Sequence, residues 1–140
     1  MTADEVILVK RTWRIFRKID AKIVGDTFYS KLFNDHPALR KSFPKNMETQ
    51  YRNLAEMLNT FIAALDKPGE LTDGIREMAQ LHMLYEIKPI YFEWAGAALL
   101  WTIRQGLGID WNEETRKAWT NCYTKIADTI LQSFPSTITR

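Results

Sequence analysis

Residues 28–37 read Phe-Tyr-Ser-Lys-Leu-Phe-Asn-Asp-His-Pro, and they span the end of one helix and the start of another. Phe28 and Leu32 stand one helical turn apart, so they continue an apolar face over residues 20–35. The polar residues before Pro37 interrupt this face, because the residue before a proline avoids the helical conformation. Pro37 suits the first turn of a short new helix, where its missing N–H has no partner to lose. The stretch therefore predicts two consecutive helices joined by a sharp break.

The same helical spacing recurs on both sides of this stretch. Upstream, apolar residues from Val6 to Phe16 recur at steps of three and four, and Thr2 with Glu5 matches a capping box. Downstream, apolar stripes predict a helix over 47–65, a helix that includes residues 75–82, a helix over 89–107 and a last helix from Asn112 onwards. Turns are predicted at 66–70, 86–89 and 106–108. No segment alternates as a strand would, so the sequence predicts one all-α domain over residues 1–140.

The composition excludes several classes of protein. The chain has 140 residues, enough to bury a full core without disulfides, and its net charge is +2. This balance is too weak to indicate nucleic acid or a membrane surface as a partner. No run approaches about 20 uninterrupted apolar residues, and the N-terminal segment lacks the apolar core of a signal peptide. The single Cys122 suits a reducing cytoplasm, with core packing or a reactive thiol as its alternative roles.

The two histidines lie in different settings. His36 precedes Pro37 in a polar break, where we expect a capping or surface role. His82 follows Ile75 and Met78 at helical spacing, on an apolar face. A histidine in this position can bond to the backbone inside a packed core, or it can bind a metal through one ring nitrogen while the other is hydrogen-bonded. Spacing alone leaves both interpretations of His82 open.

A metal-binding His82 would suit haem, because haem is a flat apolar disc that needs a slot between helices. Phe43 at the end of the short helix, the apolar stripe over 47–65, and Phe92 with Leu99 offer walls for such a slot. The sequence contains no Cys/His metal cluster, no nucleophile elbow and no Gly-rich phosphate loop.

The order and spacing of these residues resemble bacterial single-domain haemoglobins and the globin domains of flavohaemoglobins. The resemblance covers nearly the whole chain. Its motifs are residues 28–37 followed by Phe43, Leu81-His82 with Ile87-Lys88-Pro89, residues 96–100, Leu107-Gly108, and Lys117-Ala118-Trp119 with Tyr123. It implies a globin fold, a three-on-three helical sandwich around a pocket that holds haem b.

The resemblance also implies roles for individual residues. His82 matches the proximal ligand of the iron, and Phe43 matches the aromatic residue that packs on the haem face. Tyr29 matches the distal tyrosine. Gln50 matches the distal glutamine, although the loop before it is shorter than in the best-known members, and Leu54 follows as an apolar wall. The remaining haem contacts that we expect are Met78, Ile87, Phe92 and Leu99.

The residues alone leave other interpretations of this distal pair open. Tyr29 can be a half-buried tyrosine of the core, and Gln50 can be a solvated residue of a first helical turn. On the proximal side the chain departs from its relatives, which place a tyrosine and a glutamate against the histidine. The matching residues are Phe92 and Phe134, neither of which can accept a hydrogen bond. We therefore expect the His82 ring to donate to a backbone carbonyl instead.

The resemblance implies a protein that binds dioxygen reversibly, as well as nitric oxide and carbon monoxide, for transport or scavenging. Two alternatives stay open, a nitric oxide dioxygenase that works with a separate reductase and a haem-based gas sensor. The chain ends at Arg140 without a segment for flavin or nicotinamide, so we expect any reductase to be a separate protein. We expect a monomer or a weak homodimer.

Overall fold

The computed structural model describes residues 1–82 and 89–133, apart from the side chains of residues 68, 77–82, 89 and 133. Within these ranges the chain is helical and has no strand, which confirms the all-α prediction. The elements are α1 (Ala3–Phe16), α2 (Ala21–Asp35), the 3-10 helix η1 (Pro37–Ser42), α3 (Glu48–Ala63), α4 (Pro68–His82), α5 (Pro89–Leu107), the 3-10 helix η3 (Gly108–Asp110) and α6 (Glu113–Ser133).

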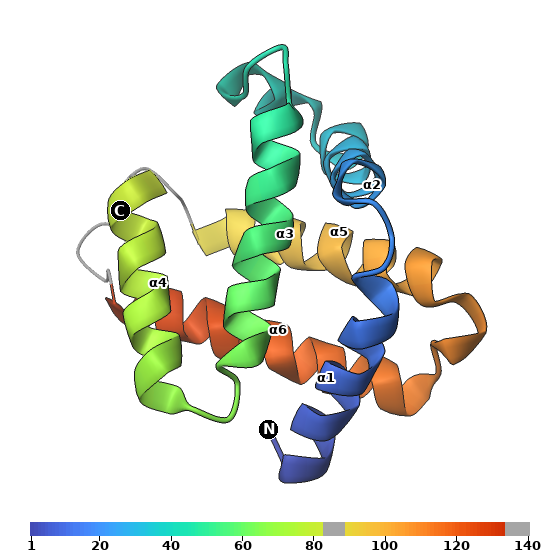
Figure 1. The fold of residues 1–140 in the computed structure, drawn as a ribbon. Coiled ribbons are helices and arrows are strands. Elements are labelled where there is room, and N and C mark those ends of the chain that lie inside the picture. The colour runs from blue at the N-terminus through green and yellow to red at the C-terminus, as the bar shows by residue number, and fades with distance from the viewer. Residues whose placement is uncertain (83–88, 134–140) are drawn as a thin grey trace.

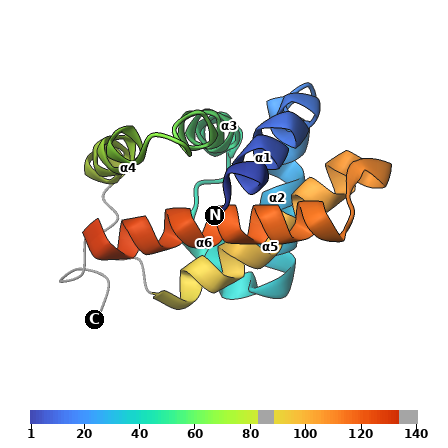
Figure 2. The same cartoon turned by 90° about the horizontal axis from the view of Figure 1, so that it is seen from below.

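The helices form two layers that cross each other (Figure 1). α3 runs across α5 and α6, and α4 lies beside α3. Figure 2, from below, shows α3 and α4 on one side and α5 and α6 on the other. α1 packs against α6, and α2 packs against both α3 and α5. This arrangement confirms the predicted helical sandwich, and it places α2 and α3 side by side where the distal residues lie.

The helix caps follow from local sequence. At the start of α1 the Glu5 N–H donates to Thr2 Oγ1 at 3.1 Å, and the Thr2 N–H donates to Glu5 Oε1 at 2.9 Å. Before α6 the Thr115 N–H donates to Asn112 Oδ1 at 2.9 Å. Such caps satisfy N–H groups that have no partner inside the helix. Both predicted caps are confirmed.

Some boundaries differ from the prediction. The turn at 66–70 is shorter than expected, because α4 already begins at Pro68, a position where proline loses no hydrogen bond. α3 ends at Ala63, two residues early. Gly106 does not end its helix but lies inside α5 against the ring of Phe16, and Gly108, with a φ of 55°, follows the last residue of α5. Of the turn expected at 86–89, residues 86–88 lie outside the described residues.

The core joins the two layers through large aromatic side chains. Trp13 of α1 stacks on Phe16 at 5.5 Å between ring centroids and lies 6.2 Å from Trp119 of α6. Inside this cluster the Trp119 Nε1–H donates to Thr12 Oγ1 at 2.9 Å. Cys122 lies in the same buried core, in agreement with the expected role in core packing. These contacts fix α1 on α6, away from the distal residues.

In the described part of the chain, none of the helices has the length and apolar character needed to cross a membrane.

Candidate functional site

The ring of Tyr29 belongs to a group of four aromatic residues that we call the distal aromatic group, comprising Tyr29, Phe33, Phe43 and Tyr51. The ring centroid of Tyr29 lies 5.5 Å from that of Phe43 and 5.9 Å from that of Tyr51. Phe33 lies 5.8 Å from Tyr29 and 5.2 Å from Phe43. The fold therefore brings Tyr29 and Phe43, which the sequence places on two different elements, into direct contact.

The hydroxyl of Tyr29 is available to donate a hydrogen bond. It has no hydrogen-bond partner among the residues that the structure describes. Burial raises the pKa of Tyr29 to about 12, and the neighbouring Tyr51 adds to this rise. The hydroxyl is therefore protonated at neutral pH and half-buried without a partner, which is the state required of a donor to a bound ligand.

The side chain of Gln50 lies in the first turn of α3. Its Oε1 atom is buried and has no hydrogen-bond partner within the described ranges. Leaving such an atom unpaired costs about 1–3 kcal/mol, so it needs an explanation. A half-turn of the amide exchanges Oε1 with Nε2, so the same place can present an acceptor or a donor. The alternative of a fully solvated Gln50 is wrong.

The close approach of α2 and α3 sets the spacing between these two polar groups. A Cβ atom on Gly25 would lie 2.5 Å from the ring of Tyr51, so only glycine leaves room for this ring. The Tyr51 hydroxyl also donates to Asp26 Oδ1 at 3.3 Å. Helical spacing in the sequence does not predict the contacts of Gly25, Asp26 or Tyr51. Gly25 lies inside the helix predicted over 20–35, and a glycine inside a helix can mark a close approach of another helix. This glycine is the feature of the sequence that indicates the contact.

The predicted apolar wall is buried. Leu54 of α3 and Leu99 of α5 are 6% and 7% exposed and belong to the core, and Phe92 packs against that core. The backbone carbonyl of Phe92 accepts a hydrogen bond from the Tyr123 hydroxyl at 2.6 Å, which ties α6 to α5. That these side chains contact haem stays a prediction.

The proximal residues cannot be placed in the same way. His82 is the last residue of α4, and its side chain lies outside the described residues, as does that of Met78. Ile87 and Phe134 also lie outside them. The described residues hold no cluster of three or more His, Cys, Asp or Glu side chains that could bind a metal ion. A haem iron can take its protein ligand from a single histidine, so haem needs no such cluster.

His36 takes a role that the sequence did not suggest. It stands between α2 and η1, but its side chain makes no capping hydrogen bond. Its ring instead stacks on Trp94 of α5, with 3.9 Å between centroids and 14° between planes. The expected capping role is confirmed for the backbone, since the His36 N–H donates to Leu32 O at 2.9 Å and the His36 carbonyl accepts from the Leu39 N–H at 3.0 Å. The half-buried ring joins α2 to α5.

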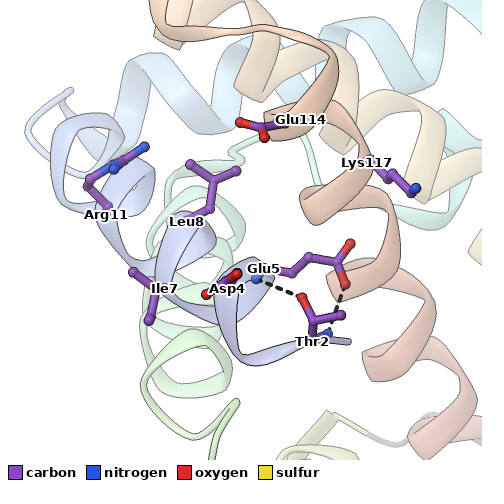
Figure 3. Close-up of a pocket in the computed structure, with 8 residues that line it drawn as sticks. All are labelled: Thr2, Asp4, Glu5, Ile7, Leu8, Arg11, Glu114 and Lys117. Atoms are coloured by element: carbon purple, nitrogen blue, oxygen red, sulfur yellow. Dashed lines mark hydrogen bonds between the residues drawn. The ribbon is translucent and has the colours of Figure 1, made fainter.

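A shallow cleft lies elsewhere on the surface, between α1 and the start of α6 (Figure 3). Its lining residues are Thr2, Asp4, Glu5, Ile7, Leu8, Arg11, Glu114 and Lys117. Glu5 is already engaged in the α1 cap, and its Oε2 accepts a hydrogen bond from Asn121 Nδ2 at 2.7 Å. None of the predicted site residues lines this cleft, so we assign no function to it.

Comparisons with known proteins identify the family. The globin family profile matches residues 26–130, so the chain belongs to the globin family. A flavohemoprotein from Deinococcus radiodurans is 29% identical over 134 residues, which cover 94% of this chain and 33% of that protein. The chain therefore spans about a third of the length of this relative. Membership of the family supports haem binding.

Two further proteins match over more than nine-tenths of both chains. An uncharacterized globin-like protein from Aquifex aeolicus is 26% identical over 132 residues, which cover 94% of this chain and 93% of that protein. The structure of a bacterial globin from Campylobacter jejuni superposes with a TM-score of 0.83, covering 96% of this chain and 97% of that one at 22% identity. The predicted globin fold is confirmed.

Proposed function

We propose that this chain is a globin that binds dioxygen reversibly at a haem b iron held by His82. The observation that carries the proposal is a pair of polar groups on adjacent helices of a globin fold, the Tyr29 hydroxyl and the Gln50 Oε1 atom, which have no partner among the residues that the structure describes. Residues 1–140 would form one globin domain, working in the cytoplasm as a monomer or weak homodimer. Nitric oxide and carbon monoxide would be further ligands.

The remaining predicted residues would hold the haem. Phe43 would pack on its face, because the distal aromatic group already fixes this ring beside Tyr29. The side chains expected to complete the apolar walls are Leu54, Met78, Ile87, Phe92 and Leu99. When bound, ferrous haem supplies the iron at which a diatomic gas binds and gains partial negative charge.

Tyr29 and Gln50 would stabilise that charge. The raised pKa of Tyr29 keeps its hydroxyl protonated, so it can donate. A hydrogen bond to a charged group contributes about 1.5–3 kcal/mol, which corresponds to roughly ten- to a hundredfold slower loss of dioxygen. Carbon monoxide is less polar and gains less. The pair therefore favours tight binding and slow release of dioxygen.

The test is the rate of dioxygen dissociation from Tyr29→Phe, measured by stopped-flow spectroscopy. We expect this rate to rise at least about tenfold, with a much smaller change for carbon monoxide. Tyr91→Phe is a matched control, because this half-buried tyrosine of α5 contacts Trp94 outside the distal aromatic group. An unchanged dioxygen rate in Tyr29→Phe would remove this residue from the distal role.

The relatives favour a second candidate function. The Deinococcus radiodurans relative is named a flavohemoprotein, which implies flavin beside haem in that protein. This chain would then act as a nitric oxide dioxygenase, which converts nitric oxide and dioxygen to nitrate and leaves the haem iron oxidised. A separate reductase would supply the electron that reduces the iron again. Sustained nitrate formation that depends on an added reductase would favour this function over reversible binding.

A further inference from the structure

We propose that Tyr51 is a positioning residue for the distal pair, which holds α2 against α3 so that Tyr29 and Gln50 act on the same ligand. The proposal rests on the distal roles of Tyr29 and Gln50 proposed above. Tyr51 itself would not touch the ligand.

The first argument is the contact between Tyr51 and Gly25. The Cβ, Cγ and Cδ1 atoms of Tyr51 all lie 2.5 Å from the place of a Cβ on Gly25, so the ring fills the notch that this glycine leaves. Protein interiors are packed tightly enough that a ring in such a notch fixes the distance between the two helices. Gly25 lies one helical turn before Tyr29 on α2. The contact between Gly25 and Tyr51 therefore also sets the distance between Tyr29 and α3.

The second argument is the hydrogen bond at the outer end of the same ring. The Tyr51 hydroxyl donates to Asp26 Oδ1 at 3.3 Å, which joins α3 to the residue after Gly25. Burial and the nearby Asp26 carboxylate both raise the pKa of Tyr51, so its hydroxyl stays protonated at neutral pH. Tyr51 is thus held to α2 at both the base and the tip of its side chain.

The third argument is that Tyr51 contacts the ring of Tyr29 and is the neighbour of Gln50 in the chain. Its ring centroid lies 5.9 Å from that of Tyr29, where it closes one side of the distal aromatic group. Tyr51 also directly follows Gln50 in α3, so a shift of this turn of α3 relative to α2 would carry the backbone of Gln50 with it. One side chain therefore couples the positions of two polar groups that come from different helices.

The test compares dioxygen dissociation from wild type, Tyr29→Phe, Tyr51→Ala and the double variant. We expect Tyr51→Ala to speed dissociation about three- to tenfold, since it weakens the Tyr29 hydrogen bond without removing it. The effects of the two substitutions should be less than additive in the double variant, because Tyr51 acts in large part through Tyr29. Tyr91→Ala serves as the control for losing a half-buried tyrosine ring. If Tyr51→Ala fails to fold, Tyr51→Phe replaces it in this test. Tyr51→Phe keeps the ring and removes only the hydroxyl, so we expect a smaller increase in the dioxygen dissociation rate.

Two further readouts separate positioning from a general loss of structure. The C–O stretching band of the carbon monoxide complex reports the donor beside the ligand, and we expect it to shift in Tyr51→Ala toward its place in Tyr29→Phe. In the protein without haem, Gly25→Ala should lower the urea midpoint of unfolding, and a Tyr51→Ala background should remove most of that loss. This second readout does not depend on any bound ligand.

Each failure has a distinct meaning. A wild-type dioxygen rate and C–O band in Tyr51→Ala, beside a fast Tyr29→Phe, would overturn the role of Tyr51 and leave the proposed function intact. Additive effects in the double variant would also overturn it. An unchanged rate in Tyr29→Phe would instead contradict the proposed distal donor itself.

Discussion

Two polar groups on the distal side, the hydroxyl of Tyr29 and the Oε1 atom of Gln50, have no hydrogen-bond partner among the described residues. Gln50 Oε1 is buried, and the side chain of Tyr29 is half-buried, which raises the pKa of its hydroxyl. Unpaired buried groups are disfavoured in a stable core, so they tend to occur where a protein binds something. At the scale of single residues, the proposed function rests on two polar groups that have no hydrogen-bond partner in the described part of the chain.

Cys122 illustrates the opposite case, a reactive group that the fold makes inert. The residue is 1% exposed, and burial raises the pKa of its thiol to about 12, although Lys125 nearby opposes this rise. The thiolate is the reactive form, so we expect negligible reaction with a thiol reagent at pH 8 in the native protein. The same reagent should label Cys122 fully in urea. Rapid labelling of the native protein would contradict core packing.

At the scale of helices, the sequence predicts what depends on neighbours along the chain. The capping box at Thr2, the break before Pro37 and the cap at Asn112 depend on local sequence, and the structure confirms all three. The contacts between helices were not predicted. Periodicity shows which face of a helix is apolar, but it does not show that Tyr51 enters a notch at Gly25, or that His36 stacks on Trp94.

The start of α1 gives a prediction with a defined pH dependence. The backbone N–H of Thr2, followed by the Asn121 side chain, holds the pKa of Glu5 below its ordinary value of 4.5. A lowered pKa means that the ionised carboxylate stabilises the folded state above pH 4.5, and this stabilisation is lost as the pH falls through the folded pKa.

The variant that tests this is Glu5→Gln, which keeps a side-chain oxygen but removes the charge. Its urea midpoint should lie below that of wild type at pH 7, and the difference should shrink toward pH 3. Glu114→Gln is a control, because the Glu114 carboxylate does not contribute to the lowered pKa of Glu5. A difference that grows as the pH falls would show that the sign of this argument is wrong.

At the scale of the whole molecule, two crossed layers of helices bring together residues that lie far apart in the sequence. Tyr29 comes from α2, Phe43 directly follows η1, and Gln50 comes from α3, while Leu99 of α5 lies in the core. Helix periodicity predicted these elements, and the resemblance to globins supplied their arrangement. The residues on the proximal side, His82 above all, were assigned by that resemblance alone, so the central claim needs a direct test.

The most direct test is the absorption spectrum of the purified protein in the ferric and ferrous states, beside His82→Ala and the control His36→Ala. We predict a Soret band in wild type and in His36→Ala, and its loss or strong reduction in His82→Ala, because His82 alone would hold the iron. A wild-type protein without a Soret band, or an undiminished band in His82→Ala, would contradict the claim that this globin binds haem through His82.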